Sequence, residues 1–348
     1  MKLEHEIVTL RTKNPFIIAR GGSSEYPVVR ITLTAPDGAT GWGEAAPSKF
    51  YGETANTVVD VLPLFAEVLD GADGWSLEAI EHALAKAIRF NGSARAAVSA
   101  ALHDMMGKRL GVPVYKLWGL DPAASPLTSF TIGIAPDEKT LRQRVDDAAQ
   151  YPVLKIKLGS SWDERIVRVV REMAPSKVLR VDANAGWTPK SALRMIPLLQ
   201  ELGVEFVEQP LPPDDIEGLR FVRERSSLPI VADESCLVSS DIPKLAGVVD
   251  GINIKLAKCG GLREALRMIA TARAHGMLVM AGCMVESSLG ITAAAHFASL
   301  LDCVDLDGAA LVSNDPYVGS TIDGGVVKLP AGPGLGVELR RASNDSNR

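Results

Sequence analysis

The chain has 348 residues, a hydrophobic fraction of 47% and a mean hydropathy of +0.12, which together predict a large buried core. Its formal net charge of −5 argues against a protein that binds nucleic acid non-specifically, because that function needs a basic surface. No segment approaches the ~20 uninterrupted apolar residues of a membrane span. The four cysteines form no C-x-x-C pair, so we expect reduced thiols in a cytoplasmic protein.

The first third of the sequence predicts an α+β domain. Residues 27–47, PVVRITLTAPDGATGWGEAAP, alternate apolar and polar positions around a Pro-Asp-Gly turn, which is typical of an antiparallel hairpin. From Leu77 to Leu110 the apolar spacing is helical and the composition is rich in alanine, and Gly111 and Pro113 then act as stop signals. We expect this first domain to cover residues 1–124.

From about Ser125 the sequence alternates between short strand-like runs and helical patterns. The runs are SFTIGI, VLKIKLG, VLRVDAN, VEFVEQP, LPIVADE, DGINIKL, LVMAGC and VDLDG. Alternation of this kind predicts parallel strands with right-handed crossovers. Eight units predict a (β/α)₈ barrel over residues 125–311, which a short final unit could leave incomplete. A doubly wound sheet is the weaker alternative, because no G-x-G-x-x-G follows an early strand.

Three consecutive predicted strands end in a carboxylate: Asp182, Glu208 and Asp233, each about one βα unit from the last. In a barrel these side chains meet at the C-terminal mouth, where active sites of this fold lie. Three carboxylates in a small buried volume need a cation, since like charges would otherwise force protonation. The oxygen ligands favour a hard divalent ion, most simply Mg²⁺. The alternative, that each acid separately caps a helix, explains one such acid better than three in register.

Lysines flank the predicted metal strands. Lys155 and Lys157 share one face of the strand before Asp182, and Lys255 lies near the end of the strand after Asp233. A lysine beside another lysine and a divalent cation is pushed towards its neutral form, which makes it a base near neutral pH. When a substrate carboxylate lies near the metal, the carbon next to it can lose its proton, which gives an enediolate. With a base on each face, the product has the opposite configuration.

These motifs resemble the enolase superfamily, in the subgroup named for muconate lactonizing enzyme. The similarity covers KIK at 155–157, the DAN, EQP and DES runs, NIKLAKCGG, and, near the N-terminus, GWGEA and ALHDMMGKRLGVPVYKLWG. The resemblance implies Lys157 and Lys255 as the acid/base pair with Lys155 assisting. It also implies Mg²⁺ on the three acids, and a C-terminal segment, 312–348, that returns to an N-terminal capping domain.

Within that subgroup the chain is similar to dipeptide epimerases of the L-Ala-D/L-Glu type, through DLDG at 305–308 and AGCMVESSLGITAAAHFA at 281–298. Asp305 and Asp307 lie two residues apart on one strand face and are not needed for the metal, so they can accept an ammonium group. The resemblance implies a dipeptide held by its carboxylate at the metal and by its amino terminus at these acids. It places Thr131, Cys283 and Met284 along the dipeptide backbone, with plain packing as the alternative for Met284.

Arg20 lies in a glycine-containing loop, IIARGGSSEY, that could cover the site as a lid. Its guanidinium could pair with an acidic substrate side chain, and a solvated loop cation is the alternative. N-acylamino acid racemase, o-succinylbenzoate synthase and cycloisomerase stay open on the same scaffold, as does a catalytically silent binding barrel. We expect a dipeptide as the small-molecule substrate, a homo-oligomer, and neither nucleic acid nor membrane as a partner.

Overall fold

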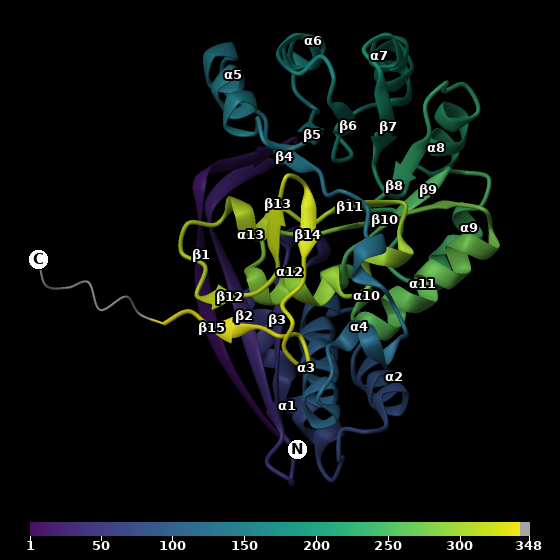
Figure 1. The fold of residues 1–348 in the computed structure, drawn as a ribbon. Coiled ribbons are helices and arrows are strands. Elements are labelled where there is room, and N and C mark those ends of the chain that lie inside the picture. The colour runs from purple at the N-terminus through teal and green to yellow at the C-terminus, as the bar shows by residue number, and fades with distance from the viewer. Residues whose placement is uncertain (342–348) are drawn as a thin grey trace, which may run out of the picture.

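The computed structural model describes residues 1–341 of the chain. Its N-terminal part is an antiparallel sheet of β1 (Lys2–Ile18), β2 (Gly21–Thr34) and β3 (Thr40–Ala45), packed on α1 (Ala55–Leu69), α2 (Leu77–Ala87) and α3 (Gly92–Leu110). We call these six elements the cap. In Figure 1 helices α1 to α3 of the cap lie below the barrel strands and α5 to α7 lie above them, while β1 runs up the left side toward β4.

Two expectations for the cap have different outcomes. The hairpin predicted around Pro36-Asp37-Gly38 is confirmed as β2 and β3, and Gly38 turns the chain with φ +82. The helical pattern of residues 77–110 forms two helices, because Phe90 and Asn91 adopt left-handed φ values of 62 and 51 between α2 and α3. An α-helix cannot continue through two residues in that conformation.

Strand β3 lies directly on α3, and glycine permits this approach. A Cβ atom added to Gly41 or Gly43 would overlap the backbone carbonyl of Ala101 or Ala97 in the helix. The GWGEA residues, 41–45, therefore set the distance between the sheet and the longest helix of the cap.

Replacing Gly43 with alanine should lower the free energy of unfolding by about 1–3 kcal/mol, since the new methyl group must push a packed helix away. Urea denaturation followed by circular dichroism measures this loss. Gly332→Ala is the matched control, because a Cβ atom there meets only Gly336 Cα at 3.4 Å. Equal stability of the Gly43 variant and wild type would show that the helix yields without cost.

The second part of the chain is a parallel sheet of eight strands in the order β11-β10-β9-β8-β7-β6-β5-β4. All eight predicted strands are confirmed, and helices separate them as expected. The strands are β4 (Phe130–Ile132), β5 (Val153–Lys157), β6 (Val178–Asp182), β7 (Val204–Glu208), β8 (Ile230–Ala232), β9 (Gly251–Ile254), β10 (Leu278–Gly282) and β11 (Cys303–Asp305). The α-helices are α4 (Val114–Leu117), which leads into the barrel, α5 (Glu138–Asp147), α6 (Asp163–Met173), α7 (Pro189–Glu201), α8 (Ile216–Arg223), α9 (Ile242–Leu245), α10 (Leu256–Cys259), α11 (Leu262–Ala274), α12 (Ser288–Ala295) and α13 (Gly308–Leu311).

The barrel is nearly closed, with a seam between its first and last strands. A single bridge joins Thr128 to Val304 across this seam, and the Ser129 amide donates to the Val304 carbonyl at 3.1 Å. The eighth unit is short, as expected, because its helix α13 has only four residues. The seam therefore depends on side chains near the mouth as well as on backbone pairing.

After α13 the chain returns to the cap. The Ser313 amide donates to the Arg11 carbonyl at 2.8 Å, and β12 (Tyr317–Val318) and β15 (Glu338–Leu339) pair beyond it, as do β13 (Thr321–Asp323) and β14 (Val326–Lys328). The buried carboxylate of Asp104 in α3 accepts from the amides of Trp42 and Leu335, both at 2.8 Å. Residues 342–348 of the predicted returning segment lie outside the described residues.

Within residues 1–341, we find no helix with the length and apolar character that a membrane span requires.

Candidate active site

The three predicted acids form one buried cluster at the mouth of the barrel. Asp182 and Glu208 are the last residues of β6 and β7 and are register partners, and Asp233 directly follows β8. One oxygen from each carboxylate lies within 4.8 Å of the others, and all three residues are fully buried. Three converging oxygen donors suit a hard divalent cation, so these residues fit a Mg²⁺ site.

A second group of residues, which we did not predict, holds one oxygen of each carboxylate. The backbone N–H of Asn184 donates to Asp182 Oδ1 at 2.7 Å, and Asn253 Nδ2 donates to Glu208 Oε1 at 2.7 Å. Lys258 Nζ lies 2.6 Å from Asp233 Oδ1. The DAN and NIKLAKCGG runs contained these residues, and the i, i+2 relation of Asn253 to Lys255 was the available signal for the asparagine.

The predicted lysines surround the cluster. Lys157 Nζ lies 2.7 Å from Asp182 Oδ2, and Lys255 Nζ lies 2.7 Å from Asp233 Oδ2, so these two ammonium groups contact the outer members of the three carboxylates. Lys155 Nζ instead touches Glu208 at 2.7 Å and Asp182 at 3.3 Å. Lys157 and Lys255 keep 8% side-chain exposure, whereas Lys155 keeps 1%. The two outer lysines are thus the ones open to the mouth.

Charges in the cluster shift several ionisation equilibria. Burial opposes ionisation of Asp182, but the charges of Lys157 and Lys155 outweigh it and hold the pKa of Asp182 below its ordinary value. Burial and the charge of Asp182 raise the pKa of Glu208 to about 7. Burial also disfavours the Lys255 ammonium, yet Asp233 outweighs it and raises the pKa of Lys255. The carboxylates alone therefore favour a charged Lys255, and the neutral form that we predict for a base depends on a divalent cation beside them.

The acid pair lies beside the seam. Asp305 Oδ2 is 2.9 Å from Lys155 Nζ, and its Oδ1 accepts from Ser129 Oγ at 2.5 Å. Asp307 accepts from the Thr131 amide at 2.6 Å, and among the described residues it has no ion-pair partner. Burial and the charge of Asp305 raise the pKa of Asp307 to about 7. Asp307 is therefore the acid that still lacks a cation, while Asp305 is already paired.

The other residues predicted to touch a substrate lie close to this pair. Thr131 Oγ1 is 3.3 Å from both Asp305 Oδ1 and Asp307 Oδ1. Cys283 and Met284 follow β10 and border Gly308, where an added Cβ atom would meet Cys283 Sγ at 3.1 Å. Met284 also packs against the apolar cluster between cap and barrel, so it has the packing role that we kept as its alternative.

Arg20 reaches the mouth from the turn between β1 and β2, but a protein carboxylate already engages it. Its guanidinium lies 2.7 Å from Glu234 Oε1, donates to the Asn184 carbonyl at 2.6 Å, and covers the ring of Phe50 at 4.1 Å. The Glu234 side chain is fully buried. We did not predict Glu234, although it follows Asp233 in the DES run.

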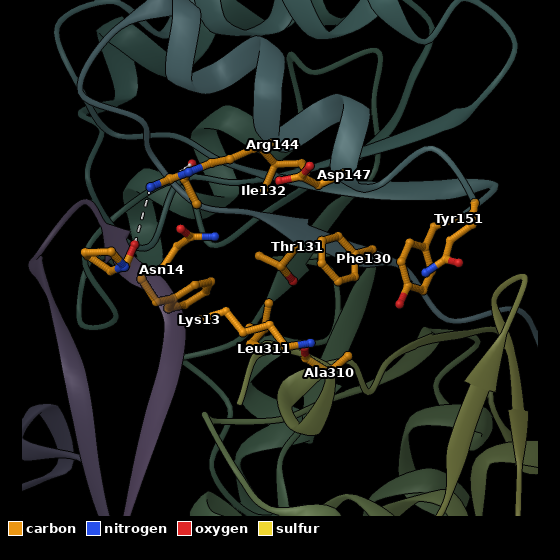
Figure 2. Close-up of a pocket in the computed structure, with 14 residues that line it drawn as sticks. Lys13, Asn14, Phe130, Thr131, Ile132, Arg144, Asp147, Tyr151, Ala310 and Leu311 are labelled. Atoms are coloured by element: carbon orange, nitrogen blue, oxygen red, sulfur yellow. Dashed lines mark hydrogen bonds between the residues drawn. The ribbon is translucent and has the colours of Figure 1, made fainter. Parts of the chain in front are cut away.

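A pocket of about 310 Å³ lies outside the seam, next to the acid pair. Figure 2 shows Lys13 and Asn14 of β1 on one side of it and Phe130 beside Tyr151, stacked with ring centroids 4.4 Å apart, on the other. Thr131 lines this pocket and also bonds to the acids. The lining residues include neither the cluster carboxylates nor the lysines around them, so the chemistry belongs to the mouth rather than to this pocket.

Comparisons with known proteins agree with this geometry. The family model "Enolase C-terminal domain-like" matches residues 138–343, and the model "Mandelate racemase / muconate lactonizing enzyme, N-terminal domain" matches residues 2–119. An L-Ala-D/L-Glu epimerase of Bacteroides thetaiotaomicron is 38% identical over 97% of this chain and 88% of its own length. A hydrophobic dipeptide epimerase of Roseobacter litoralis is 40% identical over 98% of this chain and 100% of its own.

Solved structures give the same result. The dipeptide epimerase from Enterococcus faecalis V583, complexed with Mg and the dipeptide L-Leu-L-Tyr, superposes with a TM-score of 0.92 at 33% identity and covers 97% of this chain and 98% of its own. An N-succinyl Arg/Lys racemase from Bacillus cereus superposes with a TM-score of 0.91 at 27% identity, over 97% and 95% of the two chains. Like these relatives, the protein is an isomerase of the racemase and epimerase type. The chain belongs to the mandelate racemase and muconate lactonizing enzyme family of the enolase superfamily.

Proposed function

We propose that the protein is a Mg²⁺-dependent dipeptide epimerase that inverts the α-carbon of the C-terminal residue by a two-base proton transfer. One observation carries this proposal: a buried carboxylate cluster has a lysine at each outer carboxylate, and an acid without a cation, Asp307, lies on the adjoining side of the mouth. A free dipeptide has the matching groups, which are a carboxylate, an α-proton and an ammonium.

Asp182, Glu208 and Asp233 would hold Mg²⁺. When bound, the ion supplies positive charge that makes the α-proton of a substrate carboxylate more acidic. If Asp233 shares its charge with a cation, its attraction for the Lys255 ammonium weakens. That sharing would bring Lys255 back towards the neutral form that proton removal requires.

Lys157 and Lys255 serve as the two bases in this proposal. Each ammonium has one hydrogen-bond partner within residues 1–341, so two of its three N–H groups stay available. One lysine removes the α-proton to give an enediolate, and the other returns a proton on the opposite face. Lys155 is surrounded by Asp182, Glu208 and Asp305, which suits a fixed positive charge better than a base.

A free amino terminus should matter strongly to the substrate. The ammonium would bind at Asp307, and its loss should cost about 2–5 kcal/mol because the acid is buried. N-acetylated dipeptides should therefore react far more slowly than free ones. A dipeptide library incubated in D₂O with Mg²⁺, and read by mass spectrometry for α-deuterium, measures this difference.

Two substitutions test whether Asp307 causes the preference for a free amino terminus. Asp307→Asn should remove most of the preference for free dipeptides. Asp302→Asn should leave the preference intact, because this acid lies just before β11 and pairs with Arg273 on the surface. Exchange confined to N-acylamino acids would contradict the dipeptide proposal and favour an N-acylamino acid racemase, the alternative that the Bacillus cereus neighbour keeps open.

Arg20 is our proposed contact for an acidic side chain at the C-terminal residue. Because Glu234 already holds the guanidinium, such a side chain must compete with a buried carboxylate for it. The same library tests this role. Labelling of hydrophobic or cationic dipeptides, without labelling of those that end in Glu, would leave Arg20 as a lid residue only.

A further inference from the structure

Lys258 has a different environment from every other lysine at the mouth. It lies in the short helix α10, three residues after Lys255, and its side chain has 0% exposure. Its ammonium turns back beneath the end of β9 and meets four oxygens: the Asp233 carbonyl at 2.5 Å, Asp233 Oδ1 at 2.6 Å, the Asn253 carbonyl at 2.9 Å and the Cys236 carbonyl at 3.0 Å.

This coordination excludes a role in proton transfer or in substrate contact. An ammonium has three N–H groups, and four acceptors within 3.0 Å use all of them. Lys258 therefore has no N–H group to offer a ligand and no path to solvent. A buried charge of this kind is costly unless it is paired, so the Asp233 carboxylate is its counter-charge.

The contacts show what this charge does to its neighbours. Asp233 Oδ1 belongs to Lys258, whereas Oδ2 faces Lys255 at 2.7 Å. The carboxylate cannot rotate without breaking the Lys258 contact. If Lys258 lost its charge, Lys255 would be the sole cationic partner of Asp233 among the described residues. The Asp233 carboxylate would then interact with one ammonium group instead of two.

We propose that Lys258 is a positioning residue that fixes Asp233 through Oδ1, and so keeps Oδ2 directed at the metal site and at Lys255. This inference rests on the proposed function for the part that concerns Lys255. The part that concerns Asp233 as a metal ligand does not depend on which substrate the protein uses. A residue that acts through a ligand in this way typically changes metal affinity 10- to 100-fold when it is replaced.

The cap supports the same segment from behind. A Cβ atom on Gly92, the first residue of α3, would overlap the Lys258 carbonyl, and the Leu262 amide donates to Ser99 Oγ of α3 at 2.9 Å. The helix therefore holds the backbone of residues 258–262 while the ammonium holds Asp233. Residues 258–262 therefore contact both the cap and, through Lys258, the proposed metal ligand Asp233.

The first test measures metal affinity without any substrate. Lys258→Met keeps the length of the side chain and removes its charge. We expect its Mn²⁺ affinity, measured by titration calorimetry and by the electron paramagnetic resonance signal of the free ion, to fall 10- to 100-fold. Lys177→Met is the matched control: that lysine also donates to backbone carbonyls, those of Ala148 and Ala149 at 2.8 Å, but lies away from the mouth, and its variant should bind Mn²⁺ as wild type does.

The second test measures proton exchange on each face of the substrate α-carbon separately, at saturating Mg²⁺. Using a dipeptide that wild type labels in D₂O, we expect the exchange that requires Lys255 to fall at least tenfold more than the exchange that requires Lys157. A purely structural defect would reduce both exchanges equally, and that result would overturn the proposal. Unchanged Mn²⁺ affinity would overturn it as well.

The variant could fail to fold, or wild type could label no dipeptide, and each result has its own consequence. If Lys258→Met does not fold, Lys258→Gln replaces it, because the amide keeps two N–H donors without the charge, and the same loss of Mn²⁺ affinity is expected. Failure of both variants to fold would count against a positioning role. If wild type labels no dipeptide, the proposed function fails, but the Mn²⁺ titration still decides whether Lys258 holds a metal ligand.

Discussion

Replacing Lys157 or Lys255 with alanine should abolish epimerisation, because each configuration at the α-carbon needs a base on its own face. Loss of a positioned acid or base typically costs 10²–10⁴-fold in rate. In the proposed mechanism inversion requires both lysines, so either single variant should show no measurable product of the opposite configuration. Chiral chromatography of the products over time measures this result.

Each of these variants should still exchange the α-proton of one epimer with solvent deuterium. The remaining lysine can remove that proton and return a deuteron on the same face. Lys155 cannot replace Lys157, because three carboxylates hold its ammonium at 3.3 Å or less. Lys244→Ala, at a lysine with 77% side-chain exposure, is the control. Epimerisation in both directions by either active-site variant would rule out the two-base mechanism.

Replacing Asp182, Glu208 or Asp233 with alanine should remove metal binding and activity together. A Lewis-acidic ion contributes several kcal/mol to the stabilisation of negative charge, so we expect a loss of about a thousandfold or more. Titration calorimetry with Mg²⁺ and the exchange assay measure the two losses on the same preparations. Chelation of wild type should have the same effect, and added Mg²⁺ should reverse it.

The control for this series is Glu201→Ala, which removes an exposed carboxylate at the end of α7. It should keep both metal binding and activity. A chelated, metal-free preparation that turned over at the normal rate would mean that the three acids serve another purpose.

The barrel and its acids were predictable because both follow from local patterns. In parallel strands one unit apart, residues at strand ends meet at one edge, so Asp182, Glu208 and Asp233 had to converge once the strands were placed. The lysine pair on β5 was predictable for the same reason, since the side-chain period of a strand is two.

The rest of the site depends on contacts that no local pattern contains. Lys258 lies on a four-residue helix, and its periodicity does not reveal that the ammonium turns back to Asp233. Arg20 meets Glu234 from a distant part of the sequence. Lys155 of the second barrel strand pairs with Asp305 of the last, so one acid of the predicted ammonium site already has a cation.

The contact between Asp104 and Leu335 has a consequence for the order in which the protein is made. The cap is synthesised first, yet the buried carboxylate in α3 gains the Leu335 amide only after every barrel strand has left the ribosome. Domains generally fold as units during synthesis, N-terminal first. Here α3, which precedes the barrel in the chain, waits for Leu335, which follows it, so the helix that supports the Lys258 segment completes its packing after the barrel strands are made. A nascent chain should therefore have all the strands of its active site before the packing of its cap is complete.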